Sequence, residues 1–140
     1  MRRKILCILC SCIFYAITVY AQTPIWKTAD QTTVKWEVVT GLTDGSPIPA
    51  GDIVTYQLYT KKSDGSNIVK SGSPISALSG IVTFIAEGQY FYGVSAIRKT
   101  ISGEIVESSI SWSDNPANMK DGITKGVQYY LLLKQPILIN

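Results

Sequence analysis

Residues 88–96 have the sequence Gly-Gln-Tyr-Phe-Tyr-Gly-Val-Ser-Ala, in which three adjacent aromatic side chains are followed by small ones. Successive side chains of a strand point to opposite faces of its sheet. One face of this stretch therefore carries Tyr90, Tyr92, Val94 and Ala96, and the other face carries Phe91. We expect the first face to be buried in a core. Phe91 is a candidate contact for a ligand, unless a neighbouring segment covers it.

The same alternation recurs along most of the chain, and no helical period lasts long enough to predict a helix. In residues 32–38 it places Trp36 on a buried face. In residues 53–61 it places Tyr56 in the core and Tyr59 on the opposite face, where Tyr59 either contacts a ligand or covers neighbouring strands. About seven short strands separated by turn residues predict an all-β sandwich.

Turn residues divide these strands. Asp64-Gly65 tolerates the positive φ of a tight turn and predicts a hairpin after residue 61. Residues 71–74, Ser-Gly-Ser-Pro, predict a second turn, and the composition of residues 41–52 predicts a long loop. The strands expected after the hairpin turn are residues 68–70, 80–85, 90–100 and 104–112.

The C-terminal extension, residues 114–140, begins polar and then becomes apolar between Val127 and Leu133. We expect this apolar stretch to add a strand to the sandwich, either as a further edge strand or as the resumed half of the last strand after an insertion. An edge strand could pair with a partner protein, or it could close its own sheet. Tyr129 and its neighbour Tyr130 point to opposite faces, which makes Tyr129 a candidate ligand contact.

The first 21 residues are typical of a signal peptide, with three basic residues followed by an apolar run and small residues at positions 19 and 21. We favour cleavage before Gln22. The run is shorter than the roughly 20 residues that span a bilayer, so we expect no transmembrane segment in the mature chain. The sequence therefore predicts a secreted, periplasmic or envelope protein.

All three cysteines, Cys7, Cys10 and Cys12, lie in this leader, so cleavage before Gln22 would leave a domain without disulfides. An alternative uses Leu9-Cys10-Ser11-Cys12 as a lipoprotein signal, with Cys12 as a lipidated N-terminus. The leader also carries 3 of the 13 basic residues, so the mature chain has equal numbers of basic and acidic residues. It has no basic surface of the kind that binds nucleic acid.

Three segments resemble the fibronectin type III family over residues 24–113, so that residues 22–113 would form the domain. Val34-Lys35-Trp36 is similar to the end of the family's second strand, and residues 53–59 are similar to its third strand. Tyr90 matches the position of the family's tyrosine corner, although the usual Pro is missing and the approach is one residue shorter. The resemblance implies core roles for Trp36, Tyr56, Tyr90, Tyr92 and Val94, and a habit of mediating contacts. No Arg-Gly-Asp occurs, so integrin binding does not carry over.

Catalysis has little support in the residue types present. The chain has no His, and the mature domain would have no Cys, so the commonest base, metal ligand and thiol nucleophile are missing. Asp44 and Asp64 precede glycines, a pattern that favours turns over a calcium loop. We expect no enzyme, no metal and no cofactor. The expected function is an exported binding or structural module for an unknown protein, with a lipid-anchored envelope component or a carbohydrate-binding accessory protein as alternatives.

Overall fold

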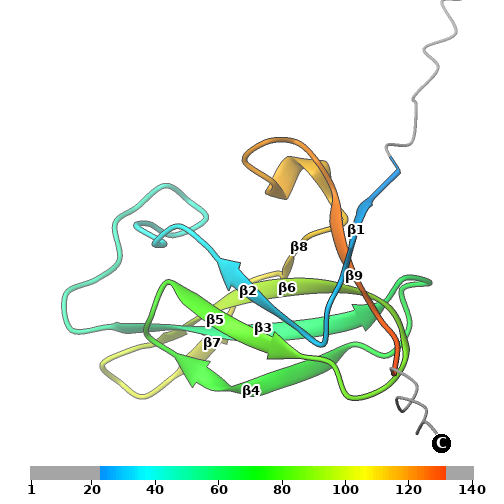
Figure 1. Cartoon of the computed structure of the whole chain (residues 1–140). Helices are drawn as coiled ribbons and strands as arrows, with labels where there is room; N and C mark the ends of the chain where they lie inside the picture. The colour runs from blue at the N-terminus through cyan, green and yellow to red at the C-terminus, as the bar shows by residue number, and fades with distance from the viewer. Residues whose placement is uncertain (1–22, 132–140) are drawn as a thin grey trace, which may run out of the picture.

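The computed structural model describes residues 23–131 (Figure 1). Within this range the chain is almost entirely strand and loop, with one 3-10 helix, η1 (Pro116–Asn118). The all-β prediction is confirmed. The strands are β1 (Ile25–Thr28), β2 (Gln31–Lys35), β3 (Ile53–Lys62), β4 (Val69–Ile75), β5 (Ser79–Thr83), β6 (Gly88–Lys99), β7 (Ile105–Glu107), β8 (Ser111–Trp112) and β9 (Lys125–Tyr129).

The larger sheet is built around β6. One edge of β6 pairs with β3 along the whole length of β3, and β4 extends the sheet beyond β3. The other edge pairs in turn with β9, β8 and β7, and β1 lies parallel to β9 at the far side. This arrangement gives the sheet the order β1-β9-β6-β3-β4.

The smaller sheet consists of β2 and β5, which pair antiparallel. Val34 from β2 and Val82 from β5 pack with Leu58 and Val127 of the larger sheet and with Phe84 in one hydrophobic cluster. The two sheets therefore form two layers that share a core (Figure 1).

The last strand of the larger sheet is interrupted. β7, β8 and β9 all pair antiparallel with the same edge of β6, opposite Arg98, Val94 and Gln89 respectively. The segment between β8 and β9, which contains η1, is thus an insertion, and β9 is the resumed half of the strand. Because β1 and β6 pair with β9 on both sides, the prediction of a free edge beginning at Val127 is wrong for the described part of that stretch; Leu133 lies outside it.

Side chains still alternate between the two faces of β6, but on both faces the degree of burial differs from the expected one. Phe91 is 5% exposed and Tyr59 is 6% exposed, which disagrees with the first of the two stated alternatives, that these side chains are open to a ligand. Trp26 covers Phe91 at a ring distance of 5.2 Å, and Trp112 packs edge-on against Tyr59 at 6.4 Å. The alternative expectation, that they lie beneath neighbouring segments, is the correct one.

The side chains that were expected in the core on the other face are only partly buried. Tyr56 is 4% exposed, but Trp36, Tyr90, Tyr92 and Val94 are half-buried side chains packed against the edge of the hydrophobic cluster. The tyrosine-corner hydrogen bond is present, since the Tyr90 hydroxyl donates to the Ala86 carbonyl at 2.9 Å.

Several local predictions hold. Asp44 and Asp64 each accept a hydrogen bond from the backbone N–H two residues later, and the glycine after each has a positive φ of 84°. The chain reverses at Asp64-Gly65 from β3 into β4, as expected for a hairpin.

Three boundaries differ from the sequence predictions. The stretch 71–74 belongs to β4, where the register with β3 shifts and the buried Gln57 side chain donates to the Gly72 carbonyl at 3.0 Å. The stretch 104–112 forms two strands, because Ser108 interrupts the ladder and accepts a hydrogen bond from the Ala96 N–H. β1 was not expected. The leader with Cys12 lies outside the described residues.

Candidate functional site

A groove of about 1050 Å³ opens between the two sheets beside β2. The larger sheet continues past β6 to β8, β9 and β1, whereas the smaller sheet ends at β2. Neighbouring strands lie about 4.8 Å apart and packed sheets about 10 Å apart. The groove therefore occupies the place where one more strand of the smaller sheet would cover the larger one.

The backbone of β2 contributes hydrogen-bonding groups to this groove. The Trp36 N–H donates to the Leu78 carbonyl at 3.2 Å, which continues the ladder on the β5 side. Since backbone groups alternate in direction along a strand, those of Thr33, Lys35 and Glu37 point away from β5. No described strand pairs with β2 on that side.

The floor of the groove is apolar and comes from the inner face of the larger sheet. Tyr92, Val94 and Ala96 of β6 line it, together with Tyr56 of β3. These β6 side chains are half-buried because, within residues 23–131, no third strand of the smaller sheet covers them. Burial raises the pKa of the Tyr92 hydroxyl above its usual range. The floor thus offers apolar surface to an occupant.

Trp36 forms the β2 side of the groove. Its ring lies 5.4 Å from that of Tyr56. Its indole Nε1 is buried and has no hydrogen-bond partner among residues 23–131. A buried donor without a partner is costly.

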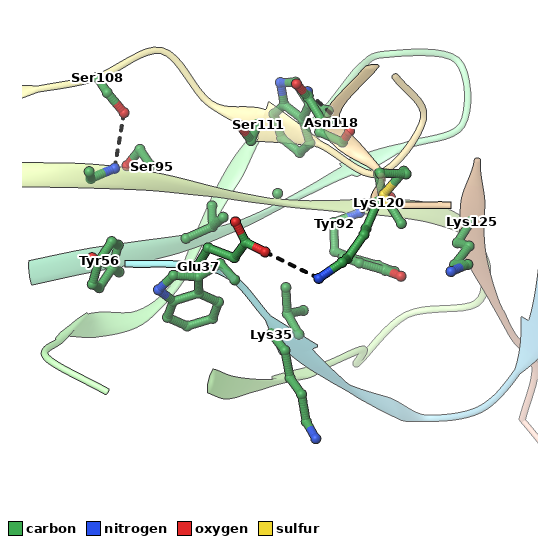
Figure 2. A pocket seen from close by; sticks show the side chains of 18 of the residues that line it. Lys35, Glu37, Tyr56, Tyr92, Ser95, Ser108, Ser111, Asn118, Lys120 and Lys125 are labelled. Carbon is green, nitrogen blue, oxygen red and sulfur yellow. Dashed lines mark hydrogen bonds and ion pairs between the residues drawn. The ribbon is translucent and has the colours of Figure 1, made fainter. Parts of the chain in front are cut away.

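Charged side chains surround the mouth of the groove. Figure 2 shows Glu37 of the β2 side facing Lys120 of the insertion, with 3.5 Å between the carboxylate and the ammonium group. Both side chains are almost fully exposed, so this ion pair contributes little. Asp121 and Lys125 form a second pair nearby, and their hydrogen bond lowers the pKa of Asp121 and raises that of Lys125.

The opposite face of the larger sheet is closed by aromatic side chains. Trp112 lies over Gly93, and Trp26 lies over Gly126, where a Cβ atom would collide with the indole. The Lys61 ammonium group sits 4.6 Å from the Trp112 ring and pairs with Asp114 at 2.8 Å. Aromatic side chains and an ion pair therefore cover this part of the face.

A small polar cluster on this closed face contains the Tyr59 hydroxyl, the Ser95 hydroxyl and Glu107. Both hydroxyls donate to the Glu107 carboxylate. These hydrogen bonds lower the pKa of Glu107, and burial followed by the Glu107 contact raises the pKa of Tyr59. The cluster has the form of a structural network, since its acceptor is already satisfied by two neighbours.

The structure does not bring the three predicted contact residues together. Tyr59 and Phe91 are buried on the closed face, and Tyr129 is half-buried on the inner face against the core. Tyr130, its neighbour, is the exposed member of the pair, at 48%. A ligand contact at Tyr129 stays a prediction, while Tyr130 is the member of the pair that faces solvent.

Neither the groove nor the tryptophans that cover Phe91 and Tyr59 were predicted from the sequence. Two glycines gave a usable signal, because a glycine inside a strand often marks the close approach of another group. Gly93 and Gly126 both have this role beneath tryptophans. The groove had no comparable signal, since it depends on the number of strands in the smaller sheet.

Two negative findings concern the described residues. No group of three or more His, Cys, Asp or Glu side chains within residues 23–131 could hold a metal ion. Asp52, a candidate loop carboxylate, is engaged by Arg98 at 2.5 Å and by the Ile101 N–H at 3.1 Å. No helix in this range has the length and apolar character needed to cross a membrane.

Comparison of the chain with models of protein families, with curated proteins and with solved structures finds no match.

Proposed function

We propose that the protein is an exported, non-catalytic binding module with a fibronectin type III-like sandwich, and that it binds an extended polypeptide segment in the groove beside β2. The sandwich assignment is supported by strand pairing. In immunoglobulin-like folds the second and fifth strands share one sheet, and the third, sixth and seventh share the other. Here β2 pairs with β5, while β3, β6 and the interrupted last strand lie together. The Tyr90 hydrogen bond to Ala86 fits the same family.

One observation carries the binding proposal: a strand edge that is unpaired within residues 23–131 borders a groove with an apolar floor. An extended peptide can add to such an edge, with main-chain hydrogen bonds supplying affinity and side-chain pockets supplying specificity. β2 supplies the edge, and Tyr92 and Val94 supply the apolar floor.

A capture experiment with groove variants tests this function. Ser111 is an exposed residue that lines the groove, opposite Val94 in the β6–β8 register. Ser111→Arg should fill the groove without disturbing the core, and this variant should no longer capture envelope proteins. Ser111→Ala should capture them as the wild type does. Equal capture by both variants, with unchanged thermal unfolding, would reject the groove as the binding site.

Carbohydrate binding is a second candidate, because Trp26 and Trp112 are partly exposed on the closed face of the larger sheet. Indole rings that lie flat on a sheet can stack against sugar rings. Titration with oligosaccharides of several classes should then change the tryptophan fluorescence, and Trp26→Ala should weaken the response. An absence of response to every oligosaccharide would remove this candidate.

The proposed export of the protein is based on the leader, residues 1–21, alone. Cleavage before Gln22 and lipidation of Cys12 give mature chains of very different mass. We propose cleavage before Gln22, and intact mass spectrometry of the exported protein distinguishes the two products.

A further inference from the structure

The groove beside β2 lies between the two sheets and is bordered by β2 and by the insertion that follows β8. A strand added to β2 would lie over β6 and β8, with the insertion on its far side. β8, β9 and β1 extend the larger sheet beyond the β2 edge, so a second folded domain has less access to that edge than an extended segment. An extended segment that belongs to no sheet of its own therefore suits the groove better than the edge of a folded domain.

The chain itself contains a segment with suitable chemistry. Six of the ten residues from Leu131 to Asn140 are Leu or Ile, and none is acidic. Leu131, the last described residue, is 64% exposed, so the apolar stretch begins at the surface. Pro136 lacks an N–H, and a strand added at an edge tolerates proline where its backbone faces outward.

The segment does not start near its own groove. The Leu131 N–H donates to Glu87, just before β6 begins, at 2.6 Å. The connection from β1 to β2 closes that end of the space between the sheets: the Ala29 N–H donates to Gln128 at 3.2 Å, and the Asp30 carbonyl accepts from Phe84 at 2.7 Å. A segment leaving Leu131 would have to pass around this connection, whereas a segment from another molecule can approach along the open side.

We propose that residues 132–140 of one copy add as a strand to the β2 edge of a second copy and cover the groove floor formed by Tyr92 and Val94. This inference rests on the proposed function, since it names the occupant of the same groove. The contact joins two different surfaces, so each copy offers both a segment and a groove. Such heterologous contacts form open chains unless the rotation closes a ring. Reciprocal exchange of the segment between two copies would close a dimer, and one-way exchange would give longer chains, so the exported protein should associate beyond the monomer.

Sedimentation velocity of the complete exported protein tests the contact from both sides. The wild type should form species that grow with concentration. Ile137→Asp with Ile139→Asp should remain monomeric, while Ile137→Val with Ile139→Val should associate. Thr33→Pro removes an N–H that points into the groove and should also remain monomeric, while Thr33→Ala keeps that N–H and should associate. Thermal unfolding of each variant excludes loss of folding as the cause.

Photo-crosslinking identifies the partner. A photoreactive amino acid in place of Leu138, in a mixture of ¹⁴N- and ¹⁵N-labelled protein, should give cross-links to β2 or β6 that join the two isotopes. Cross-links confined to single chains would overturn the proposal, because the segment would then fill its own groove. A wild type that stays monomeric and gives no groove cross-link would overturn it as well. If Ser111→Arg still abolished capture of a foreign protein in that case, the proposed function would stand and this inference alone would fail.

Discussion

The two faces of β6 differ in how they are covered, although their residues alternate along one strand. On the closed face, Phe91 and Ser95 are 5% and 2% exposed beneath the aromatic cover. On the inner face, Tyr92 and Val94 are half-buried and line an open groove. Alternation shows that two faces exist, but the cover of each depends on segments distant in sequence. Trp26 and Trp112 close one face, and the two-stranded smaller sheet leaves the other open.

Truncation of neighbouring aromatic residues on the two faces of β6 tests the difference in burial between these faces most directly. Phe91→Ala should lower the free energy of unfolding by about 3–5 kcal/mol, because it empties a buried site. Tyr92→Ala should cost about half as much, since that side chain is already partly in water. Denaturant unfolding of the two variants measures the difference. Equal costs, or a larger cost at Tyr92, would contradict the assignment of the faces.

Overpacking the closed face should have a smaller effect. A Cβ atom at Gly93 would lie 2.7 Å from both Ile110 and Trp112. Gly93→Ala should therefore destabilise the protein by about 1–3 kcal/mol. Ser111→Ala in the groove serves as the control and should leave the unfolding free energy nearly unchanged. A neutral Gly93→Ala would show that Trp112 does not rest on this glycine.

The polar cluster on the closed face should make stability depend on pH. Glu107 has a lowered pKa in the folded protein, so its carboxylate stabilises the fold above the pKa of an unfolded glutamate, about 4.3. This contribution is lost as the pH falls through the lower folded value. Thermal unfolding should thus separate wild type from Glu107→Gln near neutral pH and bring them together in acid. Glu104→Gln is the control, and a gap that widened in acid would reverse the sign and refute the network.

The ion pair between Glu37 and Lys120 at the groove mouth should contribute least to stability. Lys120→Ala should leave the unfolding temperature within error, because both partners are exposed. It should strengthen binding in the groove by no more than a few-fold, since an incoming strand no longer has to displace Lys120. Lys99→Ala, on β6 away from the mouth, is the matched control. A marked loss of binding with Lys120→Ala would mean that this lysine contacts the occupant.

Local patterns of the sequence predicted the strands and turns well. The Asp64-Gly65 hairpin, the strand at residues 90–100 and the all-β class depend on short-range alternation and turn chemistry, which the sequence displays directly. The resumed last strand was one of two stated alternatives, because an apolar run after a polar stretch is compatible with both. β1 was missed, since four residues are too few for a pattern.

The candidate site was predicted poorly, for a physical reason. Alternation left two alternatives open for Tyr59 and Phe91, ligand contact or cover by neighbouring segments, and tryptophans from β1 and β8 cover them. The groove depends on the absence of a described third strand next to β2, and no residue of β2 signals the number of its neighbours. Pairing between distant strands thus decides the site, while alternation decides only which residues share a face.

Residue-resolved amide hydrogen exchange along β2 tests the central claim most directly. In dilute protein, the Val34 and Trp36 amides, which face β5, should exchange slowly, and the Thr33 and Lys35 amides, which face the groove, should exchange fast. As the concentration rises and the protein associates, Thr33 and Lys35 should become protected. Fast exchange of these two amides in the associated protein would contradict strand addition to the β2 edge.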